Sequence, residues 1–148
     1  MKILVINGPN LSLLGMRDKS QYGILTLKMI EAKIQNEFPK DDFTFFQSNS
    51  EHDICDSIQD SNQFDGIILN PGGFSHTSVA IRDAIEASGR PIIEVHLSNI
   101  SSRENFRKTQ LTSSKTSGYV SGFKENSYLA GVFILKKMFE AKQLEGAK

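Results

Sequence analysis

The chain has 148 residues, 39% of them hydrophobic, and its seventeen basic and seventeen acidic residues give a formal charge of zero. This length predicts a single domain over residues 1–148 with a core of its own. The balanced charge, without a dominant Lys/Arg cluster, excludes nucleic acid and anionic membranes as expected partners.

Strand-like and helix-like patterns then alternate along the chain. In order, we predict a strand over 2–7, a helix over 26–38, a strand over 43–46, a helix from 50, a strand over 66–70, a helix over 77–87, a strand over 92–96, a short helix over 101–107, a loop over 108–117, a weak strand over 118–123 and a helix over about 127–144. Such alternation implies a parallel sheet with helices on both faces. We therefore predict an α/β, flavodoxin-like, doubly wound fold with a five-stranded parallel sheet.

Particular residues mark the ends of these elements. Thr26 is suited to cap the first helix, and Pro39 ends it. A capping-box pattern from Ser101 to Glu104 predicts the short helix that runs through Arg107.

No segment has the pattern of a secretory signal or a membrane span. The apolar run over 3–6 is too short for a signal, and the run over 129–135 is far below the ~20 residues that cross a bilayer. The single cysteine, Cys55, cannot form an internal disulfide, and we interpret it as a small buried side chain rather than a nucleophile. We expect a soluble protein in a reducing cytoplasm.

Polar groups follow three of the predicted strands at the point where each strand ends. The segments are Gly8-Pro9-Asn10 after the first strand, Asn70-Pro71-Gly72-Gly73 with His76 after the third, and Glu94, His96 and Leu97-Ser98-Asn99 at the fourth. In open α/β sheets, ligands bind at the carboxyl ends of the strands. The sequence therefore predicts an active site at this edge of the sheet.

Glu94 and His96 alternate with an apolar residue on one strand, so both are expected on the same face of the sheet. A carboxylate beside an imidazole fixes its tautomer and holds its proton, which suits a general acid. The alternative is a surface histidine with an incidental neighbour. We favour the acid, because the strand reads as buried and a buried Glu needs a partner.

The connection over 8–23 is long for a strand-to-helix loop, where ~2–6 residues are typical, so it is either functional or mobile. It carries Arg17 and Tyr22. Phenols ionise near pH ~10, but an adjacent arginine favours the phenolate, so the two side chains can form an activated base. The alternative is a tyrosine that only packs its ring.

Other polar residues leave two interpretations open. Pro71-Gly72-Gly73 can present backbone amides to an anion, or serve only as a tight turn with His76 capping a helix. Arg107 can reach a carboxylate or hydroxyl, or be solvated, and Asp83 reads as one half of an exposed ion pair with Arg82.

Several motifs are missing from the sequence. There is no dinucleotide or nucleoside triphosphate fingerprint and no nucleophile elbow, and the three histidines lack a metal-ligand spacing. We therefore expect acid–base chemistry on a small anion with no metal and no cofactor.

Over residues 3–129 the chain resembles the type II 3-dehydroquinate dehydratases, also called type II dehydroquinases. The resemblance rests on Ile6-Asn7-Gly8-Pro9-Asn10-Leu11, Tyr22-Gly23, Phe46-Gln47-Ser48-Asn49, Asn70-Pro71-Gly72-Gly73 with His76-Thr77-Ser78-Val79-Ala80, and Glu94-Val95-His96-Leu97-Ser98-Asn99-Ile100. It implies a flavodoxin-like fold, a dodecamer of trimers, and anti elimination of water from 3-dehydroquinate to 3-dehydroshikimate through an enolate, without metal or cofactor.

The resemblance also implies roles for site residues. Tyr22 would remove the C2 proton, with Arg17 stabilising the phenolate and the enolate. His96, supported by Glu94, would protonate the departing C1 hydroxyl, and Asn10 would hold a bridging water. The substrate-binding residues implied are Asn70, Leu97 and Ser98 for the carboxylate and nearby hydroxyls, His76 and Arg107 for the ring hydroxyls, and Asp83 from a neighbouring subunit.

The chain departs from this family at Ser12, at Ser101 and over Thr109-Gln110-Leu111-Thr112. We assign chemistry to none of these residues and expect them to bear on subunit contacts or on support of the site. Two other functions remain as alternatives. One is a Schiff-base dehydratase, for which no suitable lysine is evident, and the other is a non-catalytic flavodoxin-like paralogue that binds a small anion. A flavin-binding module is disfavoured, because the first loop lacks a Ser/Thr-rich phosphate cradle.

Overall fold

The computed structural model describes residues 1–146 and contains one five-stranded sheet with the strand order β2-β1-β3-β4-β5. All four strand pairings are parallel. The strands are β1 (Lys2–Asn7), β2 (Asp42–Gln47), β3 (Gly66–Asn70), β4 (Ile92–His96) and β5 (Gly118–Ser121). The predicted doubly wound, flavodoxin-like α/β fold is confirmed, and β5 ends two residues earlier than expected.

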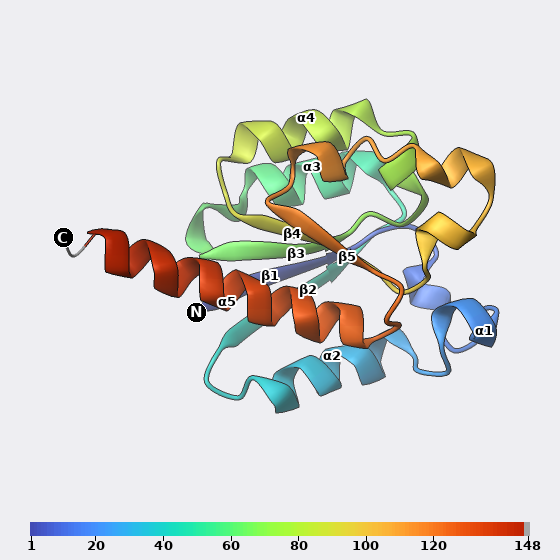
Figure 1. Cartoon of the computed structure of the whole chain (residues 1–148), viewed down its shortest axis with the longest axis horizontal. Coiled ribbons are helices and arrows are strands. Elements are labelled where there is room, and N and C mark those ends of the chain that lie inside the picture. Colours follow the sequence, from blue (N-terminus) through green and yellow to red (C-terminus); the bar gives the residue numbers. More distant parts are fainter. Residues whose placement is uncertain (147–148) are drawn as a thin grey trace.

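Helices cover both faces of this sheet (Figure 1). The α-helices are α1 (Lys19–Tyr22), α2 (Leu27–Glu37), α3 (Glu51–Gln59), α4 (Val79–Ser88) and α5 (Asn126–Gly146). Short 3-10 turns occupy the connections: η1 (Leu11–Leu13), η2 (Ser61–Gln63), η3 (Gly72–His76), η4 (Ile100–Ser102), η5 (Asn105–Lys108) and η6 (Ser113–Lys115). None of the helices in residues 1–146 has the length and apolar character needed to cross a bilayer.

The core has two halves, one on each face of the sheet. Alternate residues of β1 point to opposite faces, so that Ile3 packs with α2 and α5, whereas Leu4 packs with α3 and α4. The central strands β1, β3 and β4 are buried on both faces, as their continuous apolar runs predict.

Helix caps explain most of the helix boundaries. Thr26 accepts a hydrogen bond from the Met29 amide at 3.3 Å, as expected for the start of α2. The predicted start of α4 at residue 77 is two residues early, because Ser78 is the cap and accepts from the Ile81 amide at 2.9 Å. Residues 72–76 instead form η3.

The predicted helix over 101–107 is wrong. Two separate 3-10 turns, η4 and η5, take its place, and neither has a side-chain cap. The Glu104 carboxylate, which the capping box would place at a backbone amide, is instead within 3.3 Å of Arg103 Nε and 2.8 Å of Arg107 Nε. Two arginines therefore compete with the helix terminus for this carboxylate.

The loops after β1 and β3 are locked together at the carboxyl edge of the sheet. The Gly8 amide donates a hydrogen bond to the Asn70 carbonyl at 2.7 Å. A Cβ at residue 8 would lie 2.6 Å from the Pro71 carbonyl oxygen, so only glycine allows the two backbones to approach this closely. This contact fixes where the polar residues that follow both strands are held.

Candidate active site

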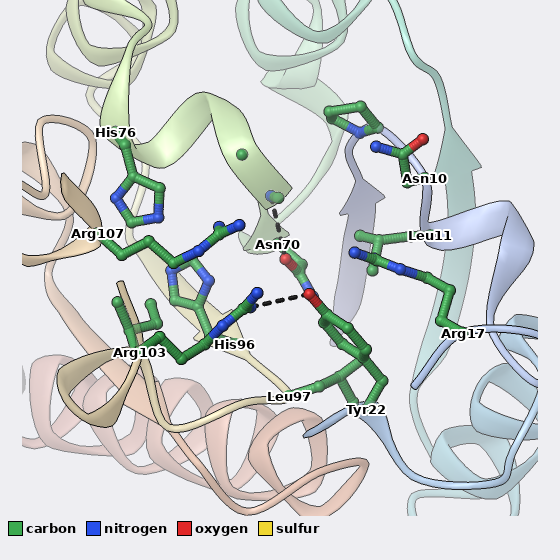
Figure 2. Close-up of a pocket in the computed structure, with 14 residues that line it drawn as sticks. Asn10, Leu11, Arg17, Tyr22, Asn70, His76, His96, Leu97, Arg103 and Arg107 are labelled. Atoms are coloured by element: carbon green, nitrogen blue, oxygen red, sulfur yellow. Dashed lines mark hydrogen bonds between the residues drawn. The ribbon is translucent and has the colours of Figure 1, made fainter. Parts of the chain in front are cut away.

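A pocket opens at the carboxyl ends of β1, β3 and β4, where the sequence places it (Figure 2). Fourteen residues line it. The polar side chains among them are Asn10, Arg17, Tyr22, Asn70, His76, His96, Arg103 and Arg107. Three are arginines and, within the described part of the chain, none of the lining residues is acidic, so the pocket suits an anionic ligand.

Glu94 and His96 form a buried pair at the end of β4. His96 Nε2 lies 2.6 Å from Glu94 Oε1, and Glu94 is 0% exposed. His96 lines the pocket, whereas Glu94 lies behind it. Because Nε2 donates to the carboxylate, the ring nitrogen left for a ligand is Nδ1.

Thr112 is the second partner of this carboxylate and was not among the predicted site residues. Its hydroxyl donates to Glu94 Oε2 at 2.7 Å, and the residue is fully buried. Each carboxylate oxygen of Glu94 thus has one hydrogen bond, which a buried charge requires. The one available signal was that Thr112 lies in the segment 109–112, where the chain departs from the family pattern.

The same segment also holds His76. His76 Nδ1 lies 2.7 Å from the Thr109 carbonyl oxygen, which can only accept, so Nδ1 carries a proton. Burial lowers the pKa of His76 below its ordinary value, the Thr109 carbonyl opposes this, and Arg107 adds to it. A neutral His76 therefore presents an unprotonated Nε2, which can accept a hydrogen bond from a ligand hydroxyl.

Arg17 and Tyr22 meet as expected, but face to face. The guanidinium carbon of Arg17 lies 3.8 Å from the centroid of the Tyr22 ring, which is cation–π geometry. The hydroxyl oxygen of Tyr22 instead accepts a hydrogen bond from Arg103 Nη1 at 2.8 Å (Figure 2). Two guanidinium groups therefore contact Tyr22, one over the ring and one at the hydroxyl oxygen.

Arg103 is a site residue that the sequence reasoning missed, because it was assigned to the capping box. Its Nη1 also donates to the Ser98 hydroxyl at 3.1 Å. Ser98 itself is not among the residues that line the pocket, whereas its neighbour Leu97 is.

Glu104 holds Arg103 and Arg107 at the rim of the pocket through the contacts given above. Its own backbone amide, followed by Arg107, lowers the pKa of Glu104 below its ordinary value. The carboxylate is half-exposed, so solvent screens this interaction. It fixes the direction of the Arg107 guanidinium, which donates a hydrogen bond to it, more than it stabilises the fold.

Asn70 is the last residue of β3, and Asn10 lies in the loop that follows β1. The Asn70 side-chain oxygen accepts from the Gly72 amide at 3.1 Å (Figure 2), so that amide is not free for an anion. Asn10 has φ of 67°, a left-handed conformation that Asn tolerates, and its amide donates to Asn49 Oδ1 at 3.0 Å. The Asn49 contact holds Asn10 at the pocket wall.

Asp83 lies outside this pocket. It is on α4 and pairs with Arg82 at 2.6 Å, with 59% of its side chain exposed. Its expected contribution to the site of a neighbouring subunit stays a prediction. Ser12 and Ser101 also lie outside the pocket, so two of the departures from the family pattern leave its lining unchanged.

The geometry defines two sides of one pocket. Figure 2 shows Asn10 and Arg17 on one side and His76, His96 and Arg107 on the other. Among residues 1–146 there is no group of three or more His, Cys, Asp or Glu side chains arranged to hold a metal ion, and the expectation of cofactor-free chemistry stays a prediction. A phenol between two arginines and an imidazole backed by a buried carboxylate can remove and return protons on one small anion.

The chain is similar to known proteins of one kind over most of its length. The family model described as dehydroquinase class II matches residues 1–136. The 3-dehydroquinate dehydratase of Helicobacter pylori (strain Shi470) is 48% identical, covering 93% of this chain and 89% of the relative, and that of Exiguobacterium sp. is 44% identical, covering 91% and 94%.

Solved structures give the same result. The type II dehydroquinase from Butyrivibrio crossotus has a TM-score of 0.89 at 40% identity and covers 92% of this chain and 97% of its own. The type II dehydroquinase from Propionibacterium acnes has a TM-score of 0.85 at 33% identity, with coverage of 91% and 96%.

Proposed function

Since the chain belongs to the class II dehydroquinase family, we propose that the pocket at the carboxyl edge of its sheet is where water is eliminated from 3-dehydroquinate to give 3-dehydroshikimate. The protein is a hydro-lyase with this activity, and the reaction is a step of the shikimate pathway. The observation that carries the site assignment is that Tyr22, hydrogen-bonded to Arg103, shares one pocket with His96, hydrogen-bonded to buried Glu94.

The base step uses Tyr22 and the two arginines that contact it. The Tyr22 phenolate removes a proton from C2, next to the C3 ketone, and the C–H electron pair moves into the carbonyl to give an enolate. Arg103 and Arg17 stabilise the phenolate before this transfer. Asn10, at the same wall, holds a water that donates to the enolate oxygen. Donors fixed in advance where negative charge develops are the main source of such stabilisation.

The acid step uses the end of β4. His96 in its protonated form gives the Nδ1 proton to the C1 hydroxyl, which leaves as water while the enolate electrons form the C1–C2 double bond and restore the ketone. Glu94 stabilises the imidazolium through Nε2. Tyr22 then holds the proton from C2 and His96 has lost one, so a net transfer through water returns both groups to their starting forms.

Substrate binding rests on the remaining polar lining. We assign the carboxylate to Asn70 and the backbone around Leu97 and Ser98, and the ring hydroxyls to His76 and Arg107. In support, Asn70, Leu97, His76 and Arg107 line the pocket, and neutral His76 offers an acceptor at Nε2.

The Schiff-base alternative is disfavoured because no lysine lies among the residues that line the described pocket. The test mixes the purified protein with 3-dehydroquinate and follows ultraviolet absorbance, because the product is a conjugated enone carboxylate. A rise that persists after treatment with borohydride and substrate supports the proposal. A flat trace from folded protein would contradict it and favour the non-catalytic paralogue that binds a small anion.

We also propose a single catalytic domain that assembles as a dodecamer of trimers in the cytoplasm, with Asp83 reaching the site of a neighbouring subunit. In support, Asp83 lies on the exposed side of α4, where its only contact among the described residues is the ion pair with neighbouring Arg82. Light scattering on the purified 16.5 kDa chain tests the assembly. An active monomer would contradict it.

A further inference from the structure

Tyr128 is a buried tyrosine that none of the steps above uses. It lies in the first turn of α5, is 0% exposed and packs in the core half that contains β1 and β4. Burial raises the pKa of its hydroxyl above the ordinary value, so the hydroxyl stays protonated. It does not line the pocket.

The hydroxyl lies between the two asparagines that end β1 and β3. Tyr128 donates to Asn7 Oδ1 at 2.6 Å and accepts from Asn70 Nδ2 at 2.9 Å. Asn70 makes a further hydrogen bond on its other side, because its Oδ1 accepts from the Gly72 backbone amide at 3.1 Å. Three hydrogen bonds therefore run in one direction, from the turn after β3 through the core to the end of β1.

This series of hydrogen bonds determines which way the Asn70 side-chain amide faces. A phenol hydroxyl has one proton to donate. Here it donates to Asn7, so the oxygen of Tyr128 can only accept from Asn70. The nitrogen of Asn70 must then face Tyr128, and its oxygen must face Gly72. A second N–H of Asn70 is left for a ligand in the pocket that Asn70 lines.

We propose that Tyr128 is a positioning residue for catalysis. Its buried hydroxyl fixes the orientation of the Asn70 amide, and so the turn at Gly72, for the oxygen atoms of the substrate. This inference rests on the proposed function of the pocket. It requires that removing the hydroxyl weakens substrate binding, since Asn70 then loses the acceptor that holds its amide in place.

The alternative is a tyrosine whose hydroxyl serves folding alone. Both alternatives predict a less stable Tyr128→Phe variant, because the change leaves two buried amides each short of one partner. Asn7 Nδ2 already has no hydrogen-bond partner among the described residues. Stability alone therefore cannot separate the alternatives, whereas substrate affinity can.

The experiment compares KM and kcat of Tyr128→Phe with those of the unaltered chain. We expect KM for 3-dehydroquinate to rise about five- to tenfold, the equivalent of one hydrogen bond, with a smaller change in kcat. Ser61→Ala is the matched control: Ser61 is also buried and donates to the Ile58 carbonyl at 2.6 Å, but it lies in η2, before β3. This control should lower the melting temperature and leave KM unchanged.

A double-mutant cycle with Asn70→Ala shows whether Tyr128 acts through Asn70. In that background, Tyr128→Phe should have no further effect on KM. If Tyr128→Phe alone leaves KM unchanged while lowering stability as Ser61→Ala does, the positioning role is wrong. If Tyr128→Phe does not fold, Asn7→Ser is the second variant: it removes Asn7 Oδ1, which accepts the Tyr128 proton, so the hydroxyl is no longer held as an acceptor towards Asn70. An unchanged KM in that variant contradicts the role. An inactive unaltered chain would instead overturn the proposed function.

Discussion

The two sides of the pocket are built differently. The acid side, Glu94, His96 and Thr112, is buried at the end of β4, with a hydrogen bond to each oxygen of the carboxylate. The base side, Arg17 and Tyr22, comes from the connection between β1 and α2 and is held by a cation–π contact and by Arg103. One side is thus fixed by the core, whereas the other depends on surface segments.

This difference follows from the chemistry of each side. A buried carboxylate is stable only when its oxygens are hydrogen-bonded, so the acid side has to be part of the folded core. A base that must admit a substrate and then enclose it is better placed on a segment that can move. Changes to the base side should therefore affect the rate alone, and changes to the acid side should affect rate and stability together.

The largest effect is expected from Tyr22→Phe. The change removes the proton acceptor but keeps the ring that packs beneath Arg17. Steady-state assays should show kcat lower by about 10²–10⁴-fold, the usual contribution of a general base. The melting temperature should be unchanged. A variant with near-normal turnover would show that Tyr22 is not the base.

Arg103→Met should come next. It removes the hydrogen-bond donor from the Tyr22 oxygen while keeping an unbranched side chain. We expect kcat to fall by about 10²-fold, as for loss of one preorganised donor. Lys108→Met, an exposed position in η5, is the control and should have normal kinetics. If Arg103→Met and Lys108→Met had the same kcat, Arg103 would have no role in catalysis.

Thr112→Val tests the acid side. A methyl group replaces the hydroxyl that donates to Glu94 Oε2, which leaves a buried carboxylate oxygen unpaired. Denaturant titration should show an unfolding free energy lower by about 1–3 kcal/mol, and kcat should fall as well. Thr109→Val, at an exposed position three residues earlier, should change neither quantity. A stable but slow Thr112→Val variant would break the comparison between the two sides.

His76 gives a smaller, pH-dependent effect. Its pKa is lowered in the folded state, so the unfolded chain binds its proton first as the pH falls. Its contribution is therefore complete above the unfolded value of ~6.5 and is lost as the pH drops from there towards the folded value. His76→Asn should lose less stability than the unaltered chain between pH 7.5 and 5.5. Denaturant titrations at the two pH values measure this. If the variant and the unaltered chain lose the same unfolding free energy between them, the prediction is wrong.

The smallest signal concerns the mobility of the base side. We expect the Arg17–Tyr22 connection to close over substrate and to be open or disordered when empty. Limited proteolysis of this segment should be slower with 3-dehydroshikimate bound than without it. The same cleavage rate in both conditions would mean that the connection is not a lid.

Most of the fold could be predicted from the sequence, because its strands are continuous apolar runs and its helices carry recognisable caps. The Glu94–His96 pair could also be predicted, since strand alternation places both on one face. Arg103 and Thr112 could not, because their partners lie 81 and 18 residues away and each sits in a polar segment without periodicity. The capping-box pattern at Glu104 likewise predicted a helix wrongly, because Arg103 and Arg107 contact the carboxylate that would otherwise cap it.

The division of labour between the two sides is tested most directly by exchange of the C2 proton of 3-dehydroquinate in D₂O, followed by NMR. If Tyr22 makes the enolate and His96 only releases the hydroxyl, the His96→Ala variant should incorporate deuterium at C2 of unreacted substrate faster than it forms product. With Tyr22→Phe, deuterium should enter C2 no faster than in substrate without protein. Exchange by Tyr22→Phe, or its absence in a correctly folded His96→Ala, would contradict the assignment of base and acid to these two sides.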